Sequence, residues 1–566
     1  IYGIELDPKS IKVAAFSLYL ALLDNLDPKT GWWNKTIQFP YLINDPEDIS
    51  LKQQGNNLFR RDTISDLSEI KELQDFDLIV GNPPFGTKKL LPTIIAYCKK
   101  ENFAPEMVLP FLYKATLLAP KGKIALIFNT KVLTNTGGTY QNFRKWLFNE
   151  NYVEKVYNFS ILRKAPKFSG GQLFGSAVGP ISIIFYQKEN PENPKDSIVY
   201  YAPKTYIKND ILEGIVIDSS DEKYLPRIEC EKPDTKIWKI AMWGSYFDFE
   251  LIEKLFKSKS LKQDLAKNNI KNGVGFQLLT NNNDKKLESQ FISENDYLDA
   301  DYIERYTSQE SNLKGINTSI KTEKAKAFYG NDDSLILDNQ AKNISHFRRR
   351  GDLEAYFAPH LLLKKGLIDN QICASYLDKD CTFRDGVYGF YSLDKNQDYL
   401  KAMTTVLNSK ISSYLLFLTI SSYGIEREQI MKNEFLTLPY SMDEETKLKL
   451  VEPFNQIFQA KRIDEENGIE TDISHLEKQI DQIIYNDILN LTKDEQVIIQ
   501  DTLDFGLDLF EKQEKSKAVL PVTTIDIYSE RICKELNDWL DDVNLKVSTT
   551  HYKIDRNCPL YMVKLS

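Results

Sequence analysis

DFDLIVGNPPFG, residues 75–86, is the stretch that decides the fold. The apolar run from Leu78 to Val80 has the composition of a buried strand, and after Gly81 the chain continues into Asn82 and two prolines. A proline pair fixes φ and cannot donate to a sheet ladder, so the chain must leave the strand as a rigid loop. In an open α/β sheet, ligands bind at the carboxyl ends of strands. The loop is therefore well placed for a functional site.

The segments on both sides of this stretch alternate between strand-like and helical patterns. Such alternation predicts an α/β fold with a doubly wound sheet over residues 1–230. Helices are expected from Ser10 to Asp24 and from Glu106 to Leu118. The expected strands have the sequences IYGIEL (1–6), FDLIV (76–80), KIALIF (123–128), VEKVYNF (153–159) and ISIIFYQ (181–187).

The remainder of the chain predicts two further domains, since 566 residues exceed what one hydrophobic core organises. A polar connector from Pro226 to Pro233 ends the first domain, which we place at residues 1–230. Residues 235–440 mix short helices with strand-like runs such as ICASYL and GVYGFYSL, which predicts an α+β domain. Residues 443–566 predict a mostly helical C-terminal region, interrupted at Pro521 and followed by a helix over Ser529–Leu540.

Composition excludes several classes of protein. Six cysteines without a CxxC pair and four histidines predict no metal site and no disulfide framework, which fits a reducing cytoplasm. No apolar run reaches the ~20 residues of a membrane span. The 72 basic and 81 acidic residues give a formal charge of −9, so a nucleic-acid partner would require locally concentrated positive charge. Ile1 already lies within a strand-like run, from which we expect an upstream segment.

The NPPF tetrapeptide has side chains suited to activating an exocyclic amine such as adenine N6, whose lone pair is delocalised into the ring. The Asn82 side-chain oxygen and the Pro83 carbonyl would each accept one amino hydrogen and favour a pyramidal nitrogen. Pro84 stiffens the loop, and Phe85 offers a face on which an extruded base stacks, worth roughly 1–3 kcal/mol. The alternative interpretation is a plain strand-terminating turn, for which asparagine and proline are also suited.

Around these residues, most of positions 1–500 resemble the amino-methyltransferase family of restriction-modification and phage-defence systems, in its large form with a fused recognition domain. GIELDP (3–8) is similar to that family's second motif, which makes Glu5 the acid on the ribose of S-adenosyl-L-methionine and places Leu6 against its adenine. Asp62 in NNLFRRDTI resembles the third motif, whose acid accepts from the cofactor's adenine amine. A helix cap is the other interpretation of Asp62.

The resemblance also implies an aromatic residue that closes the far face of the target base. GGQLFGSAVGPISIIFYQ (170–187) is similar to the eighth motif, with Phe174 as the candidate and Phe168 as its competitor, although a core position is the commoner role of such residues. The first motif, a glycine loop preceding the second motif, is absent. We therefore expect an upstream domain or another chain to complete the cofactor site.

Several downstream stretches resemble the target-recognition region of large adenine methyltransferases, which argues against a ribosomal RNA or release-factor methyltransferase. In residues 343–366, five basic side chains against two acidic ones leave a local charge of +3. Arginines near aromatic residues suit phosphate contact, and a solvated charged face is the alternative. The predicted DNA contacts are Arg348, Arg349, Arg350, Lys364 and Lys365.

These observations predict an adenine-N6 methyltransferase that acts on double-stranded DNA, uses S-adenosyl-L-methionine and works with restriction or defence subunits. One alternative is cytosine-N4 transfer, in which serine more commonly stands where Asn82 does. The other is a DNA-binding defence component whose incomplete methyl site is completed by another chain.

Overall fold

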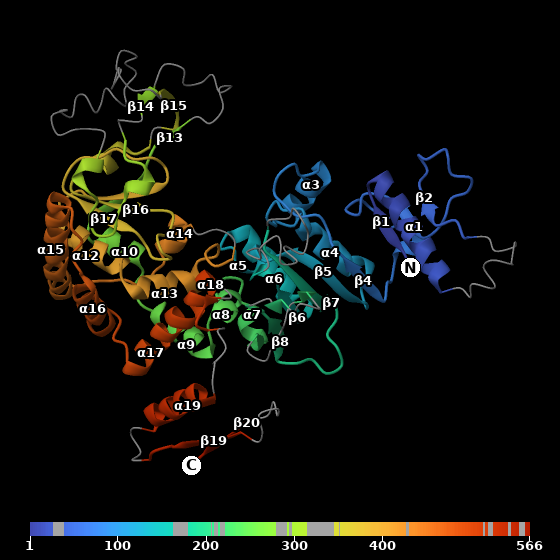
Figure 1. Cartoon of the computed structure of the whole chain (residues 1–566). Coiled ribbons are helices and arrows are strands. Elements are labelled where there is room, and N and C mark those ends of the chain that lie inside the picture. The colour runs from blue at the N-terminus through green and yellow to red at the C-terminus, as the bar shows by residue number, and fades with distance from the viewer. Residues whose placement is uncertain are drawn as a thin grey trace. The chain divides into compact units, whose positions relative to one another are not determined.

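A computed structural model describes the chain apart from residues 26–38, 162–178, 205–206, 209–212, 215–220, 279–290, 294–296, 314–343, 350, 426–428, 513–514, 519–524, 541–544 and 554–560. Contacts divide it into two compact units, Ile1–Leu503 and Asp504–Ser566 (Figure 1). The boundaries predicted near residues 230 and 440 lie inside the first unit and stay predictions. No described helix has both the length and the apolar character that crossing a membrane requires.

The chain begins with a small parallel sheet covered by one helix. Strands β1 (Gly3–Glu5), β3 (Leu58–Arg60) and β2 (Ile43–Asn44) pair in that order. Helix α1 (Pro8–Asp24) starts at Pro8 because Asp7 caps it by accepting from the Ser10 amide at 2.8 Å, and proline suits a first helical turn. Its buried residues Ile11 and Ala15 pack with Leu58.

The second sheet is the mixed α/β core. Its six strands run in the order β11 (Glu222–Pro226), β8 (Ser197–Tyr201), β6 (Tyr152–Asn158), β7 (Ile181–Gln187), β5 (Lys123–Asn129) and β4 (Leu78–Gly81). The predicted α/β class is confirmed. The strands of the sheet are not all parallel, however, because β7 runs antiparallel between β5 and β6. The accompanying helices are α3 (Pro92–Lys100), α4 (Val108–Leu118), α5 (Lys131–Thr134) and α6 (Gly138–Asn149).

Strand β4 is the outer strand of this sheet. It pairs in parallel with β5, with Gly81 opposite Leu126. Parallel strands are normally buried, yet Leu78 is 60% exposed and Val80 is 69% exposed. Among the described strands β4 is paired along one edge only, and its exposed Leu78 and Val80 lie on the same face of the sheet. The small sheet connects to this region through a buried cluster of Phe59, Leu67 and Leu73, against which Phe76 and Leu118 pack.

Gly122 allows the turn before β5 to lie against the start of β4. A Cβ at Gly122 would lie 2.0 Å from the Phe76 carbonyl oxygen, whereas a Cβ at Gly138 would meet nothing within 4 Å. We expect Gly122→Ala to destabilise the fold by about 1–3 kcal/mol, as overpacking does, and Gly138→Ala to leave it nearly unchanged. Thermal melts of both variants test this, and equal melting temperatures would contradict it.

Residues 227–440 form a helical layer, a sheet and a smaller sheet. The antiparallel sheet has the order β12 (Ile270–Val274), β18 (Val387–Ser392), β16 (His360–Lys364) and β17 (Ala374–Leu377), and its core includes Phe276, Tyr356 and Phe383. The helices are α7 (Arg227–Cys230), α8 (Ile237–Trp243), α9 (Tyr246–Leu255), α10 (Leu261–Lys267), α12 (Gln397–Leu407), α13 (Lys410–Thr419) and α14 (Lys432–Phe435). The smaller sheet has the order β13 (Gln277–Leu278), β15 (Ile344–Arg349) and β14 (Phe291–Ser293). Before this region, β9 (Ile207–Lys208) and β10 (Glu213–Gly214) form a separate two-stranded pair.

Helices then dominate up to Leu503. Helix α15 (Glu444–Asn467) ends at Gly468, whose φ of 63° suits a left-handed cap. Helices α16 (Ser474–Ile483) and α17 (Lys493–Asp501) follow, each continued by a π-helical turn. In the second unit, α18 (Asp508–Lys512) and α19 (Ile525–Trp539) precede an antiparallel hairpin of β19 (Thr549–Lys553) and β20 (Tyr561–Leu565).

Polar contacts tie the α/β core to the residues that follow it. Thr134 Oγ1 donates to the Ser421 carbonyl at 3.3 Å, and Thr136 Oγ1 donates to Glu434 Oε1 at 3.3 Å. Nearby, the buried Lys239 donates to the Tyr423 carbonyl. Burial lowers the pKa of Lys239 to about 7, opposed only by Glu434.

This buried lysine predicts a pH-dependent stability. Between pH 7 and its ordinary pKa of 10.5, the unfolded chain binds a proton at Lys239 that the folded chain does not. Stability should therefore rise with pH above 7, by up to about 1.4 kcal/mol per pH unit. We expect Lys239→Met to reduce this rise, with the remainder coming from Lys223, whose pKa burial also lowers to about 7, and the exposed-site control Lys254→Met to keep the full rise. Urea unfolding at pH 7, 8 and 9 measures the slopes, and parallel slopes for wild type and Lys239→Met would contradict the prediction.

Candidate functional site

The NPPFG loop leaves the carboxyl end of β4 and is fixed at its far end. Asn82 is exposed, Pro83 is buried and Phe85 is half-buried. Gly86 has a φ of 122°, a conformation that favours glycine, and its carbonyl accepts from the Met107 amide at 3.0 Å. The loop is thus held between β4 and the start of α4, with the Asn82 side chain open to solvent.

Glu5 and Asp62 lie at the carboxyl ends of neighbouring parallel strands. Glu5 is the last residue of β1, and Asp62 follows the end of β3. Glu5 Oε1 accepts from the Asp7 amide at 2.8 Å, and Asp62 Oδ1 accepts from the Ile64 amide at 2.9 Å. Each acid therefore stabilises a local turn, and the turn after Asp62 is not the start of a helix. Neighbouring Leu6 is 50% exposed.

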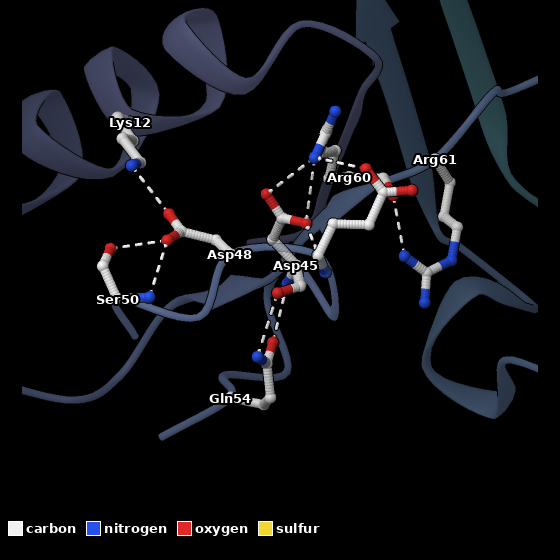
Figure 2. Close-up of polar contacts among 8 residues, drawn as sticks. Lys12, Asp45, Asp48, Ser50, Gln54, Arg60 and Arg61 are labelled. Atoms are coloured by element: carbon white, nitrogen blue, oxygen red, sulfur yellow. Dashed lines mark hydrogen bonds and ion pairs between the residues drawn. The ribbon is translucent and has the colours of Figure 1, made fainter. Parts of the chain in front are cut away.

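Charged side chains brace the strands that carry these two acids (Figure 2). Arg60 of β3 lies 3.3 Å from Asp45 and 2.9 Å from Glu47, while Lys12 of α1 lies 2.7 Å from Asp48. The hydrogen bond from Lys12, followed by those from Ser50, lowers the pKa of Asp48 to about 2. The network connects α1, β3 and the segment after β2, and so fixes the strand ends at which Glu5 and Asp62 lie.

The structure brings the predicted residues together in two groups. Glu5, Leu6 and Asp62 share one edge of the small sheet, and the NPPF residues lie at the end of β4. Among the described residues, no hydrogen bond or ion pair joins the two groups. Phe174 and Phe168 lie outside the described residues.

The predicted basic patch is divided between two sheets. Arg349 is exposed at the end of β15, where the backbone of Arg348 also lies, and Arg350 is outside the described residues. Lys364 ends β16 and lies 3.2 Å from Asp301. Lys365 lies 4.7 Å from the Tyr388 ring centroid, and burial lowers its pKa. The part of the chain that the structure describes contains no group of side chains suited to holding a metal ion.

A polar cluster beside the NPPFG loop was not anticipated from the sequence. The side chain of Glu106 is fully buried, and its Oε2 accepts from the Tyr140 hydroxyl at 2.5 Å and lies 3.3 Å from Lys131 Nζ. The sequence pattern predicted only a helix from Glu106 to Leu118 here. The available signal was an acid placed directly before an apolar helix, where a buried carboxylate needs partners from elsewhere in the chain.

A known family matches the N-terminal part of the chain. Residues 1–163 match the sequence model of the family described as Eco57I restriction-modification methylase. This part of the chain is a methylase of the restriction-modification type.

Solved structures of restriction-modification enzymes show partial likeness. MmeI, a type IIL restriction-modification enzyme solved with DNA, is 12% identical, with 82% of this chain and 60% of MmeI covered and a TM-score of 0.45. The type IIG restriction endonuclease BpuSI is 12% identical, with 76% of this chain and 56% of BpuSI covered and a TM-score of 0.28. The type I restriction enzyme EcoKI M protein is 15% identical, with coverages of 45% and 53% and a TM-score of 0.23. The chain thus spans 56% of BpuSI and 60% of MmeI.

Proposed function

We propose that the chain is a site-specific DNA methyltransferase that transfers a methyl group from S-adenosyl-L-methionine to adenine N6 in double-stranded DNA, within a restriction-modification or phage-defence system. The observation that carries the proposal is the NPPFG loop in a methylase domain. The loop leaves the end of β4 with Asn82 exposed and is anchored through Gly86 to α4.

In this proposal each residue of the loop has a separate role in activating the adenine amine. The Asn82 side-chain oxygen and the Pro83 carbonyl each accept one hydrogen of the adenine amine, so that the nitrogen lone pair is directed away from the ring. Pro84 limits the movement of both acceptors because its φ is fixed. Phe85, which is half-buried, keeps one face available for stacking on a base that has left the duplex. Phe174 is proposed to cover the opposite face.

The residues at the other strand ends fit the proposed cofactor. The carboxylate of Glu5 uses Oε1 for the Asp7 amide, which leaves Oε2 for ribose hydroxyls. The exposed side chain of Leu6 offers apolar surface to the adenine ring, and Asp62 retains Oδ2 for the adenine amine. When bound, the cofactor supplies an electrophilic methyl group.

We also propose that a further polypeptide segment completes this cofactor site. Two features of β4 support this: it is the outer strand among the described strands of its sheet, and its exposed Leu78 and Val80 leave apolar surface on one face, whereas parallel strands are normally covered on both faces. Such a segment, in the same or another chain, would carry the missing glycine loop. The basic residues Arg348, Arg349, Arg350, Lys364 and Lys365 are proposed to contact DNA phosphates, with the exposed Arg349 as the best placed of those described.

A labelled methyl-transfer assay tests the function. The full chain is incubated with methyl-labelled S-adenosyl-L-methionine and phage DNA from a host without DNA methylation, and the DNA is digested to nucleosides. Label in N6-methyl-2′-deoxyadenosine is expected. Label in N4-methyl-2′-deoxycytidine would favour transfer to the cytosine amine, and DNA binding without any label would favour a DNA-binding component whose methyl site is completed by another chain.

A further inference from the structure

Glu106 lies at the same sheet edge as the NPPFG loop. It immediately precedes Met107, whose amide donates to the Gly86 carbonyl at 3.0 Å and so fixes the end of the loop. Its ion-pair partner Lys131 begins α5 directly after β5, the strand that pairs with β4. Glu106, Lys131 and Tyr140 therefore form a polar group next to the loop that presents Asn82.

The carboxylate of Glu106 is only half satisfied. Its side chain is 0% exposed, and Oε2 receives both the Tyr140 hydroxyl and the Lys131 ammonium group. Oε1 is buried and has no hydrogen-bond partner among the described residues. Buried polar atoms are nearly always hydrogen-bonded, and an unpaired oxygen of a charged group is especially costly. This oxygen is therefore suited to accept a hydrogen bond from a group that arrives with a ligand.

The positions of Lys131 and Tyr140 around Glu106 suit a carboxylate that accepts a hydrogen bond from a ligand. Tyr140 and Lys131 come from two different helices, α6 and α5, and hold Oε2 from outside α4. The side chain of Lys131 is 21% exposed, so the group extends from the interior towards the surface. A carboxylate held in this way is an acceptor of defined position and negative charge, which selects an amino or ammonium donor rather than an anion.

We propose that Glu106 Oε1 accepts a hydrogen bond from an N–H donor of a ligand bound beside the NPPFG loop, and that Tyr140 and Lys131 are the positioning residues for this carboxylate. The proposal rests on the proposed methyltransferase function. Two donors share the required chemistry, namely the ammonium group of the methyl donor's amino-acid part and the amino group of the target base. The experiment separates them.

The test compares Glu106→Gln with the control Glu101→Gln, which changes a more exposed acid near the start of the same region. Calorimetry measures the dissociation constants of S-adenosylhomocysteine, which carries the ammonium group, and of 5′-methylthioadenosine, which lacks it. Methyl transfer to unmethylated phage DNA gives kcat and KM for DNA. A charge-assisted hydrogen bond is worth about 10- to 100-fold in binding. Circular dichroism checks folding, and Tyr140→Phe, which retains the carboxylate, replaces Glu106→Gln if that variant does not fold.

Each outcome has a defined meaning. A loss of 10-fold or more for S-adenosylhomocysteine, with 5′-methylthioadenosine unchanged, assigns the ammonium donor. A similar loss in kcat/KM for DNA with unchanged S-adenosylhomocysteine binding assigns the target base. A folded Glu106→Gln protein that matches Glu101→Gln in every measurement would overturn the role of Glu106 alone. A wild-type chain that neither binds S-adenosylhomocysteine nor transfers label would overturn the proposed function together with it.

Discussion

Replacing Asn82 with alanine is expected to lower kcat for methyl transfer to DNA by about 100-fold or more, the scale on which removal of one pre-positioned transition-state hydrogen bond acts. The Asn82 side chain is exposed at the end of β4, and the Gly86–Met107 contact fixes the far end of the loop. Alanine removes the acceptor without disturbing that contact. In the proposed mechanism the Pro83 carbonyl remains, and one acceptor alone would leave the amine lone pair delocalised into the ring.

A matched control and a binding measurement make this prediction specific. Asn142→Ala removes a side-chain amide on α6 that donates to the Asn102 carbonyl at 3.2 Å, and we expect it to leave kcat within about twofold, as surface changes away from special features usually do. DNA affinity, measured by fluorescence anisotropy, should stay nearly constant in both variants. Equal label incorporation by wild type and Asn82→Ala would refute the assignment of Asn82.

Replacing Asp248 with alanine is expected to reduce the free energy of unfolding by about 3–5 kcal/mol, because removal of a buried charged acceptor leaves several donors unpaired. Asp248 is 2% exposed, and its carboxylate accepts from the Tyr414 hydroxyl at 3.0 Å and the Thr502 hydroxyl at 2.6 Å. It also accepts from the Ser245 amide at 2.6 Å, which closes the capping box of α9. One side chain thus joins α9, α13 and the end of α17.

Asp443 provides the comparison for this second prediction. It also caps a helix, accepting from the Thr446 amide at 2.8 Å, but it is exposed. We expect Asp443→Ala to cost only a small fraction of the loss at Asp248. Urea unfolding followed by far-ultraviolet circular dichroism measures both variants. Similar losses would show that Asp248 acts only as a local helix cap and not as a connection between helices.

Local pattern was sufficient to predict much of the α/β core. The run ISIIFYQ coincides with β7, Ile181–Gln187, and KIALIF lies within β5, Lys123–Asn129. The helix predicted from Ser10 begins two residues earlier, because Asp7 caps it and Pro8 suits its first turn. These features depend on residues close together in the sequence. The position of NPPF at a strand end was predicted for the same reason.

Features that depend on distant residues were not predicted. The antiparallel direction of β7 is set by its pairing with β5 and β6, which its own sequence does not encode. Residues 343–366 look like one basic patch, but Arg349 and Lys364 belong to strands of different sheets. The Glu106 cluster joins residues separated by 25 and 34 positions, and Asp248 meets Thr502 across 254 positions. Each of these features depends on contacts that form only in the tertiary fold.

The exposed side of β4 has a consequence for handling the protein. An uncovered strand with free backbone donors and acceptors is a template on which another chain can add a strand. Here the template carries Leu78 and Val80, so apolar contact would reinforce such pairing. The net charge of −9 opposes close approach of two copies, and salt screens that repulsion. High ionic strength and high protein concentration together should therefore favour aggregation that starts at β4, the strand that leads into Asn82.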